Sequence, residues 1–385
     1  MITANQCLTA TRVDINTLAG LKKQWQALAG DCFMQHPAWI LSAFQHYHLK
    51  QPSVDSAQHA ALLVQDTSGQ LNGCGLWFRQ LSHGLNWWKL AGSGAICSDY
   101  VTVPALQGSE AEVGFALADW FQARPRGLLG WPTAIEIEGH LQTCPLWQSF
   151  VSSLEHAGWA SDCVEVEGAW KLDLPNDWTT YESLLHKSRR RKARKAIKLI
   201  HQNKFCHRVA SCAGAIQQAW PDFIRLHQKR RQFLNQPGCF SDPDFEIFLR
   251  KATLELAEQG SAWMSIVQHP DGQPLAMLLM FDSGRHAFMY QSGIDTDCLH
   301  DEPGHLVNAA TIQHCIEKGI ETFDFLRGDE PYKRGWLANR HALNRTRLFA
   351  PGWTGRGIAS AIKLRRSIFS WRKAESCHMD IQDED

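Results

Sequence analysis

The sequence lacks a net charge, a long apolar run and a targeting segment. Its 39 basic and 39 acidic residues cancel, so no overall electrostatic field attracts the protein to nucleic acid or to a membrane. No window reaches the roughly eighteen uninterrupted apolar residues that a membrane-spanning helix needs. The first residues, MITANQCLTATR, show no signal-peptide profile. We therefore expect a cytoplasmic protein without an integral membrane segment.

The twelve cysteines lack every pattern that marks a disulfide framework or a zinc site. No C-x-x-C pair is present, and no cysteine and histidine lie at the spacing of zinc ligands. This scatter indicates free thiols in a reducing compartment, and we expect no metal. The sequence also has no G-x-S-x-G elbow and no thiol–histidine arrangement of the nucleophilic type.

What the chain does contain is an internal repeat. Its 385 residues are enough for two domains. Segment 62–78 (LLVQDTSGQLNGCGLWF) aligns without gaps onto segment 265–281 (SIVQHPDGQPLAMLLMF), at a constant offset of 203. Upstream, Cys32–Phe33 before a proline is echoed by Cys239–Phe240 before another proline. Two hairpins can match by chance, because turn chemistry favours glycine anyway. The common order of helices and hairpin favours duplicated domains.

Residues 286–336 carry the densest set of functional signals. The pattern predicts a strand from His286 to Ser292, a helix from Pro303 to about Lys318, and a strand over 320–326. Proline suits the first position of a helix, because its missing N–H is not needed there. The free amides at such a helix start and the helix dipole both favour a phosphate group. The segment therefore predicts an anion site beside the end of a strand.

The same segment resembles the FemAB-like and CelD-like acyltransferases of the GNAT superfamily. The matching motifs are Tyr290-x-x-Gly293-x-Asp295, Pro303–Gly304, and Phe323–Asp324–Phe325 followed by Gly328–Asp329–Glu330–Pro331–Tyr332–Lys333-x-x-Trp336. The resemblance implies an α/β (α+β) fold of two tandem GNAT-like domains, with mixed sheets flanked by helices. It also implies transfer of an acyl group, acetyl in the first instance, from acyl-CoA to an amine. An amino sugar of envelope or exopolysaccharide metabolism is the acceptor that the resemblance suggests.

One departure from the family leaves the donor open. The glycine-rich pyrophosphate signature of GNAT enzymes is replaced here by Pro303–Gly304. Aminoacyl-tRNA, the donor in the Fem branch, is therefore retained as an alternative to acyl-CoA. A third alternative is a non-catalytic scaffold of a polysaccharide-synthesis complex, in which both domains have lost their chemistry.

The two halves are expected to differ in role. We place a degenerate GNAT-like domain at residues 1–174, a catalytic one at 175–350, and an amphipathic helix with an acidic tail at 351–385. The first half has no counterpart of the tyrosine–lysine loop and is expected to shape a cleft. The basic helix predicted over 357–373 either docks on the domain, the commoner outcome, or makes peripheral contact with an anionic membrane.

A basic helix opens the second half. Residues 179–203 are predicted to form one helix, capped by Thr179 or Thr180, with a buried stripe of alanine and isoleucine. Eight basic side chains crowd its other faces between Lys187 and Lys198. This run is either a solvated face or an anion site for the donor's phosphates, a nucleotide-linked sugar or an RNA backbone.

Acyl transfer needs a bound donor, a polarised carbonyl, a neutral amine and a route for its proton. The candidates for the chemistry are Asp324, Asp329, Tyr332 and Lys333. Tyr332 is expected to protonate the departing thiolate, and Lys333 to stabilise the tetrahedral intermediate. The candidates for donor binding are Gln291, Gly293, Pro303, Gly304, His305, Leu306, Arg190 and Arg191. The acceptor cleft is assigned to Tyr290, Asp295, Arg327 and Trp336. The GNAT resemblance implies that a backbone N–H around residues 291–293 meets the carbonyl, where that strand splays from its neighbour.

Overall fold

The computed structural model describes residues 7–82, 84–123, 133–352, 357 and 360. The first half of the chain contains β1 (Thr9–Val13), α1 (Ile15–Gly20), α2 (Lys22–Leu28), α3 (Pro37–His46), β2 (Val54–Gln65), β3 (Leu71–Ser82), β4 (Leu85–Leu90), α4 (Glu110–Gln122), β5 (Thr133–His140), α5 (Pro145–His156) and β6 (Ala160–Asp173). The second half contains α6 (Trp178–Leu184), α7 (Lys187–His201), β7 (Cys206–Ala210), α8 (Ala213–Phe233), α9 (Pro243–Glu258), β8 (Ala262–Gln268), β9 (Pro274–Asp282), β10 (His286–Ile294), α10 (Pro303–Glu317), β11 (Thr322–Arg327), α11 (Pro331–Gly335) and β12 (Asn339–Phe349).

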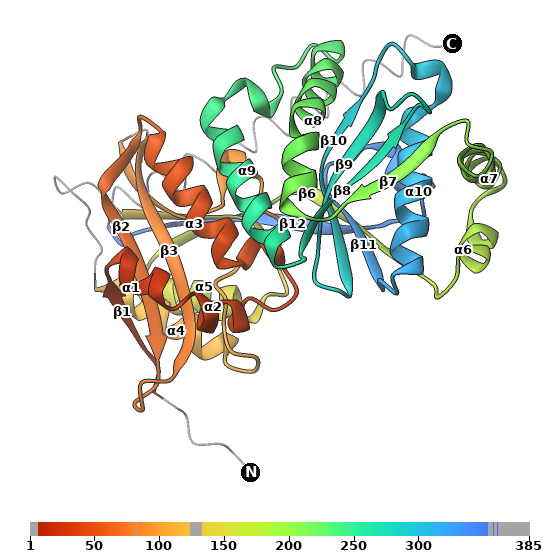
Figure 1. Cartoon of the computed structure of the whole chain (residues 1–385). Helices are drawn as coiled ribbons and strands as arrows, with labels where there is room; N and C mark the ends of the chain where they lie inside the picture. The colour runs from red at the N-terminus through yellow and green to blue at the C-terminus, as the bar shows by residue number, and fades with distance from the viewer. Residues whose placement is uncertain (1–6, 83, 124–132, 353–356, 358–359, 361–385) are drawn as a thin grey trace, which may run out of the picture.

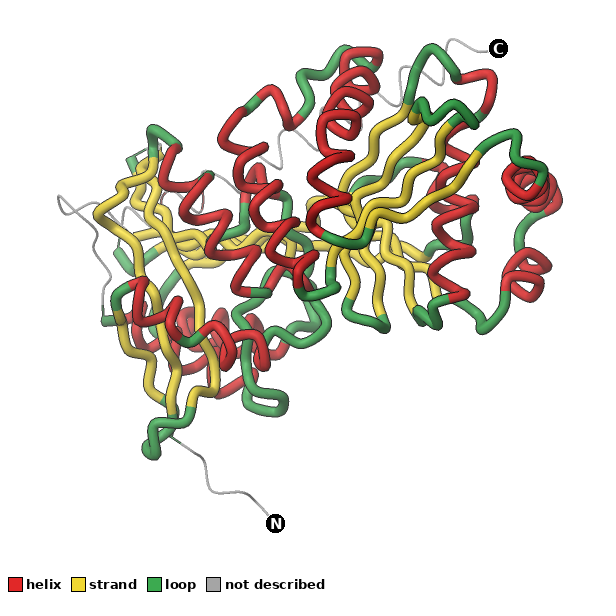
Figure 2. Tube along the Cα trace, viewed as in Figure 1, coloured by secondary structure: helices red, strands yellow, loops and turns green. Residues whose placement is uncertain are grey.

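The twelve strands of the described residues form one mixed sheet that runs across the molecule (Figures 1 and 2). Its order is β1-β2-β3-β4-β5-β12-β6-β11-β10-β9-β8-β7. Helices cover both faces. In the second half, α8 and α9 lie on one side of β7–β11, while α10, with α6 and α7 outside it, lies on the other (Figure 1). The expected mixed α/β architecture is confirmed.

The two predicted hairpins share one register. Each residue pair of the β8–β9 hairpin has its counterpart in β2–β3 at the offset of 203. Even the irregularity recurs, between Val64 and Gln65 in one hairpin and between Val267 and Gln268 in the other. Each hairpin continues into an antiparallel and then a parallel neighbour. The sequence alignment therefore reflects the same local structure used twice.

The halves are joined by exchanging one strand each. β6, from the first half, pairs with β11, and β12, from the second half, pairs with β5. The exchanged strands also pair with each other, from Asn339↔Lys171 to Phe349↔Ala160. Because backbone hydrogen bonds cross between the halves at all three of these junctions, each half needs the other to complete its sheet.

An aromatic cluster packs the halves together on the α8 side of the sheet. The ring of Phe33 stacks on Phe281 at 4.1 Å between centroids, and the ring of Trp39 meets Tyr290 edge-on at 4.9 Å. Helix α3 of the first half lies along α9 of the second. Burial of these rings supplies apolar area and oriented aromatic contacts at the junction.

The basic segment 179–203 differs from its prediction. It forms two helices, α6 and α7, because the backbone leaves helical geometry at Leu185 and His186, with ψ of 142° and 145°. The cap of α6 is Asp177, whose carboxylate accepts a hydrogen bond from Thr180 N at 2.8 Å. An ionised carboxylate is a strong capping acceptor, and it takes the place predicted for Thr179 or Thr180.

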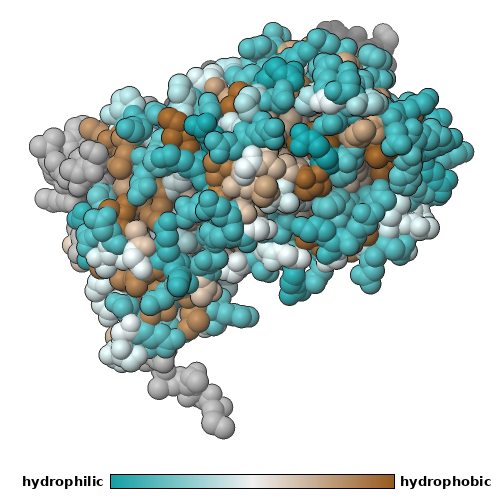
Figure 3. Space-filling model, in the orientation of Figure 1, coloured by the Kyte–Doolittle hydropathy of each residue, from teal (hydrophilic) through white to brown (hydrophobic). Residues whose placement is uncertain are grey.

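The visible surface is mostly hydrophilic, most evenly so at the edge formed by α6 and α7 (Figure 3). Within the described part of the chain, no helix combines the length and the apolar character needed to cross a bilayer. The helix predicted over 357–373 lies outside the described residues.

Candidate functional site

Strands β10 and β11 separate in the middle of the second half. They pair in parallel at three positions, the last of which is Phe288↔Asp324. Beyond it, β10 has a bulge between Met289 and Gln291, and Leu326 in β11 adopts a left-handed backbone with φ of 56°. The expected separation of the strand before α10 from its neighbour is therefore present.

A cavity of about 520 Å³ opens beside this gap. The start of α10, the last turn of α8, the end of β10 and the loop through α11 form its wall. Its lining residues are Arg230, Arg231, Leu234, Leu278, Met289, Ser292, Ile294, Leu299, Glu302, Pro303, Gly304, His305, Val307, Asn308, Glu330, Tyr332 and Trp336. The structure thus brings the predicted helix start and the predicted tyrosine–tryptophan loop together in one place.

The start of α10 offers fewer free amides than expected. Glu302 precedes the helix in a left-handed conformation, with φ of 54°. Its carbonyl accepts hydrogen bonds from His305 N at 2.8 Å and from Leu306 N at 3.2 Å. Leu306 itself is 2 % exposed and packs in the core. Pro303 has no N–H, so among the described residues Gly304 supplies the one amide at this terminus without a carbonyl partner.

Side chains from α7 surround the start of α10. Arg189 places Nη1 2.6 Å from His305 Nδ1, and its guanidinium lies 5.0 Å from the centre of the Trp336 ring. Lys192 Nζ lies 2.6 Å from the Glu302 carboxylate. Burial, followed by the charges of Arg189 and Lys192, lowers the pKa of His305 to about 4. His305 is therefore neutral at pH 7 and the charge of Glu302 is compensated, which leaves the positive end of the helix dipole available.

The sequence analysis did not predict the two arginines of the cavity. Arg230 and Arg231 belong to the last turn of α8 and both line the cavity. Arg231 donates to Gln236 Oε1 at 2.9 Å, and Arg230 lies over the ring of Phe233. In the described part of the chain, neither has a carboxylate partner. Guanidinium groups without a counter-charge at a cavity favour an anionic ligand.

The two arginines predicted for the donor's phosphates lie elsewhere. Arg190 turns back onto the α6–α7 junction, where it donates to Ser183 O at 2.8 Å and Leu185 O at 2.9 Å. Arg191 is exposed and does not line the cavity. Three further basic side chains of α7 pair with glutamates. Helical geometry points neighbouring side chains in different directions, and Arg189 is the arginine that reaches α10.

Lys333 is buried beneath the end of β11 and does not line the cavity. It is 2 % exposed, and its Nζ donates to the carbonyls of residues 326, 327 and 328 at 3.2, 2.7 and 2.9 Å. Glu330 Oε2 lies 2.9 Å away. An ammonium group has three donors, and these contacts use them. In this structure Lys333 therefore holds the end of the strand, and its contact with a tetrahedral intermediate stays a prediction.

Asp324 lines a different cavity, on the opposite face of the sheet. Its carboxylate accepts hydrogen bonds from Tyr100 Oη and Leu326 N, both at 2.7 Å. This second cavity, of about 390 Å³, lies between the halves and also contains Lys171. Burial raises the pKa of Asp324 to about 7. No residue lines both this cavity and the one at α10, so the structure does not bring Asp324 to the predicted donor site.

Asp329 and Arg327 form contacts next to the site. Asp329 Oδ1 accepts from Trp170 Nε1 at 3.1 Å and from Arg340 Nε at 2.9 Å. The hydrogen bond from Arg340 is the main cause that lowers the pKa of Asp329. Arg327 pairs with the buried carboxylate of Asp99 in the first half. Neither residue lines the cavity at α10, and both tie β11 to the rest of the sheet.

Tyr290, Asp295 and Gly293 also lie outside this cavity. Tyr290 Oη donates to the Ile96 carbonyl of the first half at 2.7 Å. Asp295 accepts a hydrogen bond from Lys229 Nζ at 2.5 Å, which ties the end of β10 to α8. Gly293 is the position at which α8 crosses β10. These residues support the walls of the site rather than its interior.

Gln291 lines a third cavity, together with His227 and Cys239. His227 Nε2 lies 3.6 Å from Cys239 Sγ. The sequence indicated no thiol–histidine arrangement, but the fold assembles one from α8 and the turn before α9. Only the echo of Cys32–Phe33 in Cys239–Phe240 had drawn attention to this turn.

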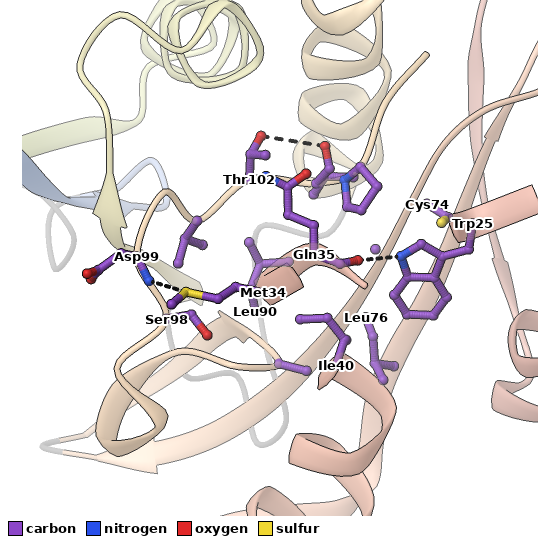
Figure 4. A pocket seen from close by; sticks show the side chains of 15 residues that line it. Trp25, Met34, Gln35, Ile40, Cys74, Leu76, Leu90, Ser98, Asp99 and Thr102 are labelled. Atoms are coloured by element: carbon purple, nitrogen blue, oxygen red, sulfur yellow. Dashed lines mark hydrogen bonds between the residues drawn. The ribbon is translucent and has the colours of Figure 1, made fainter. Parts of the chain in front are cut away.

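A cavity in the first half is far smaller. It measures about 20 Å³, which is about the room needed for one water molecule. Met34, Leu76 and Leu90 are among the side chains around it (Figure 4). Trp25 Nε1 donates to the Gln35 carbonyl at 3.0 Å beside it (Figure 4). This cavity has no room for a large carrier molecule.

Among the described residues, one group of three has donor atoms placed to suit a metal ion. His269, Cys298 and Asp301 hold their ligand atoms within 4.8 Å of one another. The group lies where the β8–β9 turn meets the loop before α10. None of the three lines the cavity at α10.

Residues 187–334 match the model of a family described as the acetyltransferase (GNAT) domain. This segment contains α7, both separated strands, α10 and most of the loop that closes the cavity. By sequence, this part of the chain is similar to the GNAT acetyltransferase domain. No curated protein matches the sequence.

Three solved structures show the same fold over most of the chain. FemX is 10 % identical, with 88 % of this chain and 96 % of FemX covered at a TM-score of 0.60. The C-terminal domain of a putative lysylphosphatidylglycerol synthetase from Agrobacterium fabrum is 10 % identical. The match covers 90 % of this chain and 95 % of that domain, with a TM-score of 0.51. L-PGS from Bacillus licheniformis is 9 % identical, and the match covers 87 % of this chain and 92 % of L-PGS with a TM-score of 0.50. At these identities the likeness establishes the fold alone.

Proposed function

We propose that the protein is an acyltransferase that moves an acyl group from an acyl-CoA thioester to a primary amine. One observation carries this proposal. The start of α10 and two arginines without carboxylate partners face one cavity of about 520 Å³, beside the gap between β10 and β11. Acetyl is the acyl group and an amino sugar of envelope or exopolysaccharide metabolism the acceptor suggested by the family resemblance.

The geometry assigns the donor's parts to particular groups. Its phosphates would meet Arg230, Arg231 and the free amide of Gly304, where guanidinium groups and a helix terminus both favour anions. The thioester would enter the gap, where the pairing of β10 with β11 ends at Phe288↔Asp324 and leaves backbone groups of β10 for the carbonyl. Burial raises the pKa of Tyr332, which keeps its hydroxyl protonated and able to donate to the departing thiolate.

Calorimetry with acetyl-CoA and CoA tests this assignment. We expect both to bind the wild-type protein, and Arg230→Ala to weaken binding about tenfold, since a hydrogen bond to a charged group contributes about 1.5 kcal/mol. Arg250→Ala, an exposed arginine on α9, is the matched control and should bind normally. Absence of binding to the wild-type protein would remove acyl-CoA as the donor.

The retained alternative is aminoacyl-tRNA as the donor. It is favoured by the outer face of α7, where Lys187, Arg191 and Lys198 are exposed. If the protein binds tRNA with an affinity that falls steeply with salt concentration and does not bind CoA, the donor is aminoacyl-tRNA. If neither carrier binds, the non-catalytic scaffold remains.

A further inference from the structure

A buried imidazole faces a thiol on the α8 side of β10. His227 is 1 % exposed, and its Nε2 lies 3.6 Å from Cys239 Sγ. Its Nδ1 lies 3.1 Å from Gln228 Oε1. The amide of Gln228 is oriented by its own donation to Pro237 O at 3.0 Å, so Oε1 is an acceptor. Nδ1 must then carry the proton, and Nε2 presents its lone pair to the thiol.

The pair lines a cavity of about 280 Å³ beside the bulge of β10. Gln291, the residue after the bulge, lines it too, whereas Met289 and Ser292 of the same strand line the cavity at α10, the carrier cavity. Side chains of a strand alternate between its faces, so Gln291 and its neighbour Ser292 point to opposite sides of β10. The bulge between Met289 and Gln291 shifts this alternation and puts Met289 on the side of Ser292. The two cavities therefore lie on opposite sides of β10. Arg231 lines both. They therefore adjoin at Arg231, and Gln291 places the second cavity beside the bulge of the strand that borders the gap.

The surroundings of the pair suit a proton acceptor rather than a nucleophile. Burial raises the pKa of Cys239 to about 12, so the thiol keeps its proton. Burial also lowers the pKa of His227 to about 4, so the imidazole is neutral at pH 7. Arg231 is the charged side chain of this lining, and its positive charge disfavours an ammonium ion there. The cavity therefore selects an amine in its neutral, reactive form.

We propose that this cavity receives the primary amine acceptor, and that Cys239 and His227 relay its proton. The inference rests on the acyltransferase function proposed above. The amine nitrogen forms a bond to the thioester carbon, and the carbon–sulfur bond breaks. The proton lost by nitrogen passes to Cys239 Sγ as the thiol proton passes to His227 Nε2. Tyr332 protonates the departing carrier thiolate, and the proton held by His227 passes by way of solvent to the resulting tyrosinate. All three side chains are thereby restored, and an amide and a free thiol are released.

Protection of Cys239 from alkylation tests where the amine binds. The full chain, with CoA bound, is treated with iodoacetamide, and modification of individual cysteines is followed by peptide mass spectrometry. Glucosamine, L-lysine, ethanolamine and L-alanine serve as probes. We expect at least one to slow modification of Cys239 and to leave the exposed Cys212 unaffected. If none of these amines protects Cys239 although CoA binds, the acceptor does not occupy this cavity. The inference on the acceptor site is then wrong, while the proposed acyltransferase function is unaffected. If CoA itself does not bind, the proposed function has failed first.

Turnover by variants tests the relay, using the protecting amine and acetyl-CoA. His227→Gln and Cys239→Ala should lower kcat about 100-fold, the lower range for loss of general base catalysis, with CoA binding unchanged. Cys239→Ser should recover most of the activity, because a hydroxyl also relays a proton. A merely structural pair would predict loss of thermal stability in all three variants with kcat preserved in the folded fraction. That pattern would overturn the relay.

Discussion

Two buried charged groups control the end of β11. Lys333 binds three successive carbonyls there, and Asp324 accepts the amide of Leu326, which has a left-handed backbone. A non-glycine residue in that conformation costs about 1 kcal/mol or more, and these contacts hold it in place. Both side chains thus stabilise the shape of the gap in which we place the thioester.

Lys333→Met should lower the thermal stability of the protein rather than act directly on turnover. The substitution keeps the length of the side chain but leaves three carbonyls and Glu330 without their partner. A buried carbonyl left without a donor costs about 1–3 kcal/mol, so we expect a clearly lower Tm. Lys187→Met, on an exposed lysine, should leave Tm unchanged. Normal stability with lost turnover would instead return Lys333 to a direct role.

Asp324 should make stability depend on pH in an unusual direction. Its pKa rises from 3.8 to about 7 on folding, because of burial. The folded state therefore binds this proton more tightly, so the group's favourable contribution is complete below pH 4 and is lost as pH rises through about 7. Asp324→Asn lacks this loss. We expect the Tm of Asp324→Asn, relative to wild type, to be higher at pH 8 than at pH 5. An unchanged difference would mean that the carboxyl does not titrate between pH 5 and pH 8.

At the scale of elements, the contact between α8 and β10 sets the spacing of two cavities. Gly293 lets the helix approach: a Cβ at this position would lie 2.8 Å from both His227 N and Leu226 Cβ. The same helix carries Arg230 and Arg231 to the carrier cavity and His227 to the other. The placement of α8 therefore affects both proposed ligand sites at once.

Gly293→Ala should push α8 away from β10. Overpacking of this kind costs about 1–3 kcal/mol, and it should weaken CoA binding as well, because the arginines move with the helix. Gly214→Ala, in the same helix but with nothing within 4 Å of the added Cβ, is the matched control and should be neutral or slightly stabilising. Differential scanning fluorimetry with and without CoA measures both effects. Equal Tm and CoA affinity in the two variants would contradict this assignment of Gly293.

At the scale of the whole molecule, strand exchange makes the halves interdependent. β12 lies between β5 and β6, and β6 lies between β12 and β11. The ion pair of Arg327 with buried Asp99 and the ring contacts of Phe33 and Trp39 cross the same junction. A fragment cut between the halves would expose unpaired strand edges, which promote aggregation.

Fragments 1–174 and 175–385 should each be insoluble or poorly folded alone. Co-expressed, they should associate into a folded complex, because the exchanged strands can still pair. Solubility, co-purification and circular dichroism of the separate and joint fragments provide the measurement. Independent folding of either fragment with a cooperative thermal transition would show that the strand exchange is dispensable.

Much of the local structure followed from local patterns. Proline, glycine and apolar periodicity predicted α10 and the strands on either side of it, and turn residues predicted both hairpins. The donor cavity was partly anticipated, through residues 303–305 and the tyrosine–tryptophan loop. Arg230 and Arg231 were not, because two arginines at the end of an amphipathic helix look the same whether they face water or a cavity.

The sequence by itself determined the repeat, its hairpin register and the glycine-terminated helix beside a strand end, since these depend on residues within a few positions of one another. The tertiary structure alone decided which face each charge meets. It placed Asp324 and the predicted donor site on opposite faces of the sheet, and it buried Lys333 beneath the end of a strand. It also brought His227 next to Cys239. These contacting residues belong to separate elements of the fold. A short-range sequence pattern therefore does not predict which way their side chains point in the folded protein.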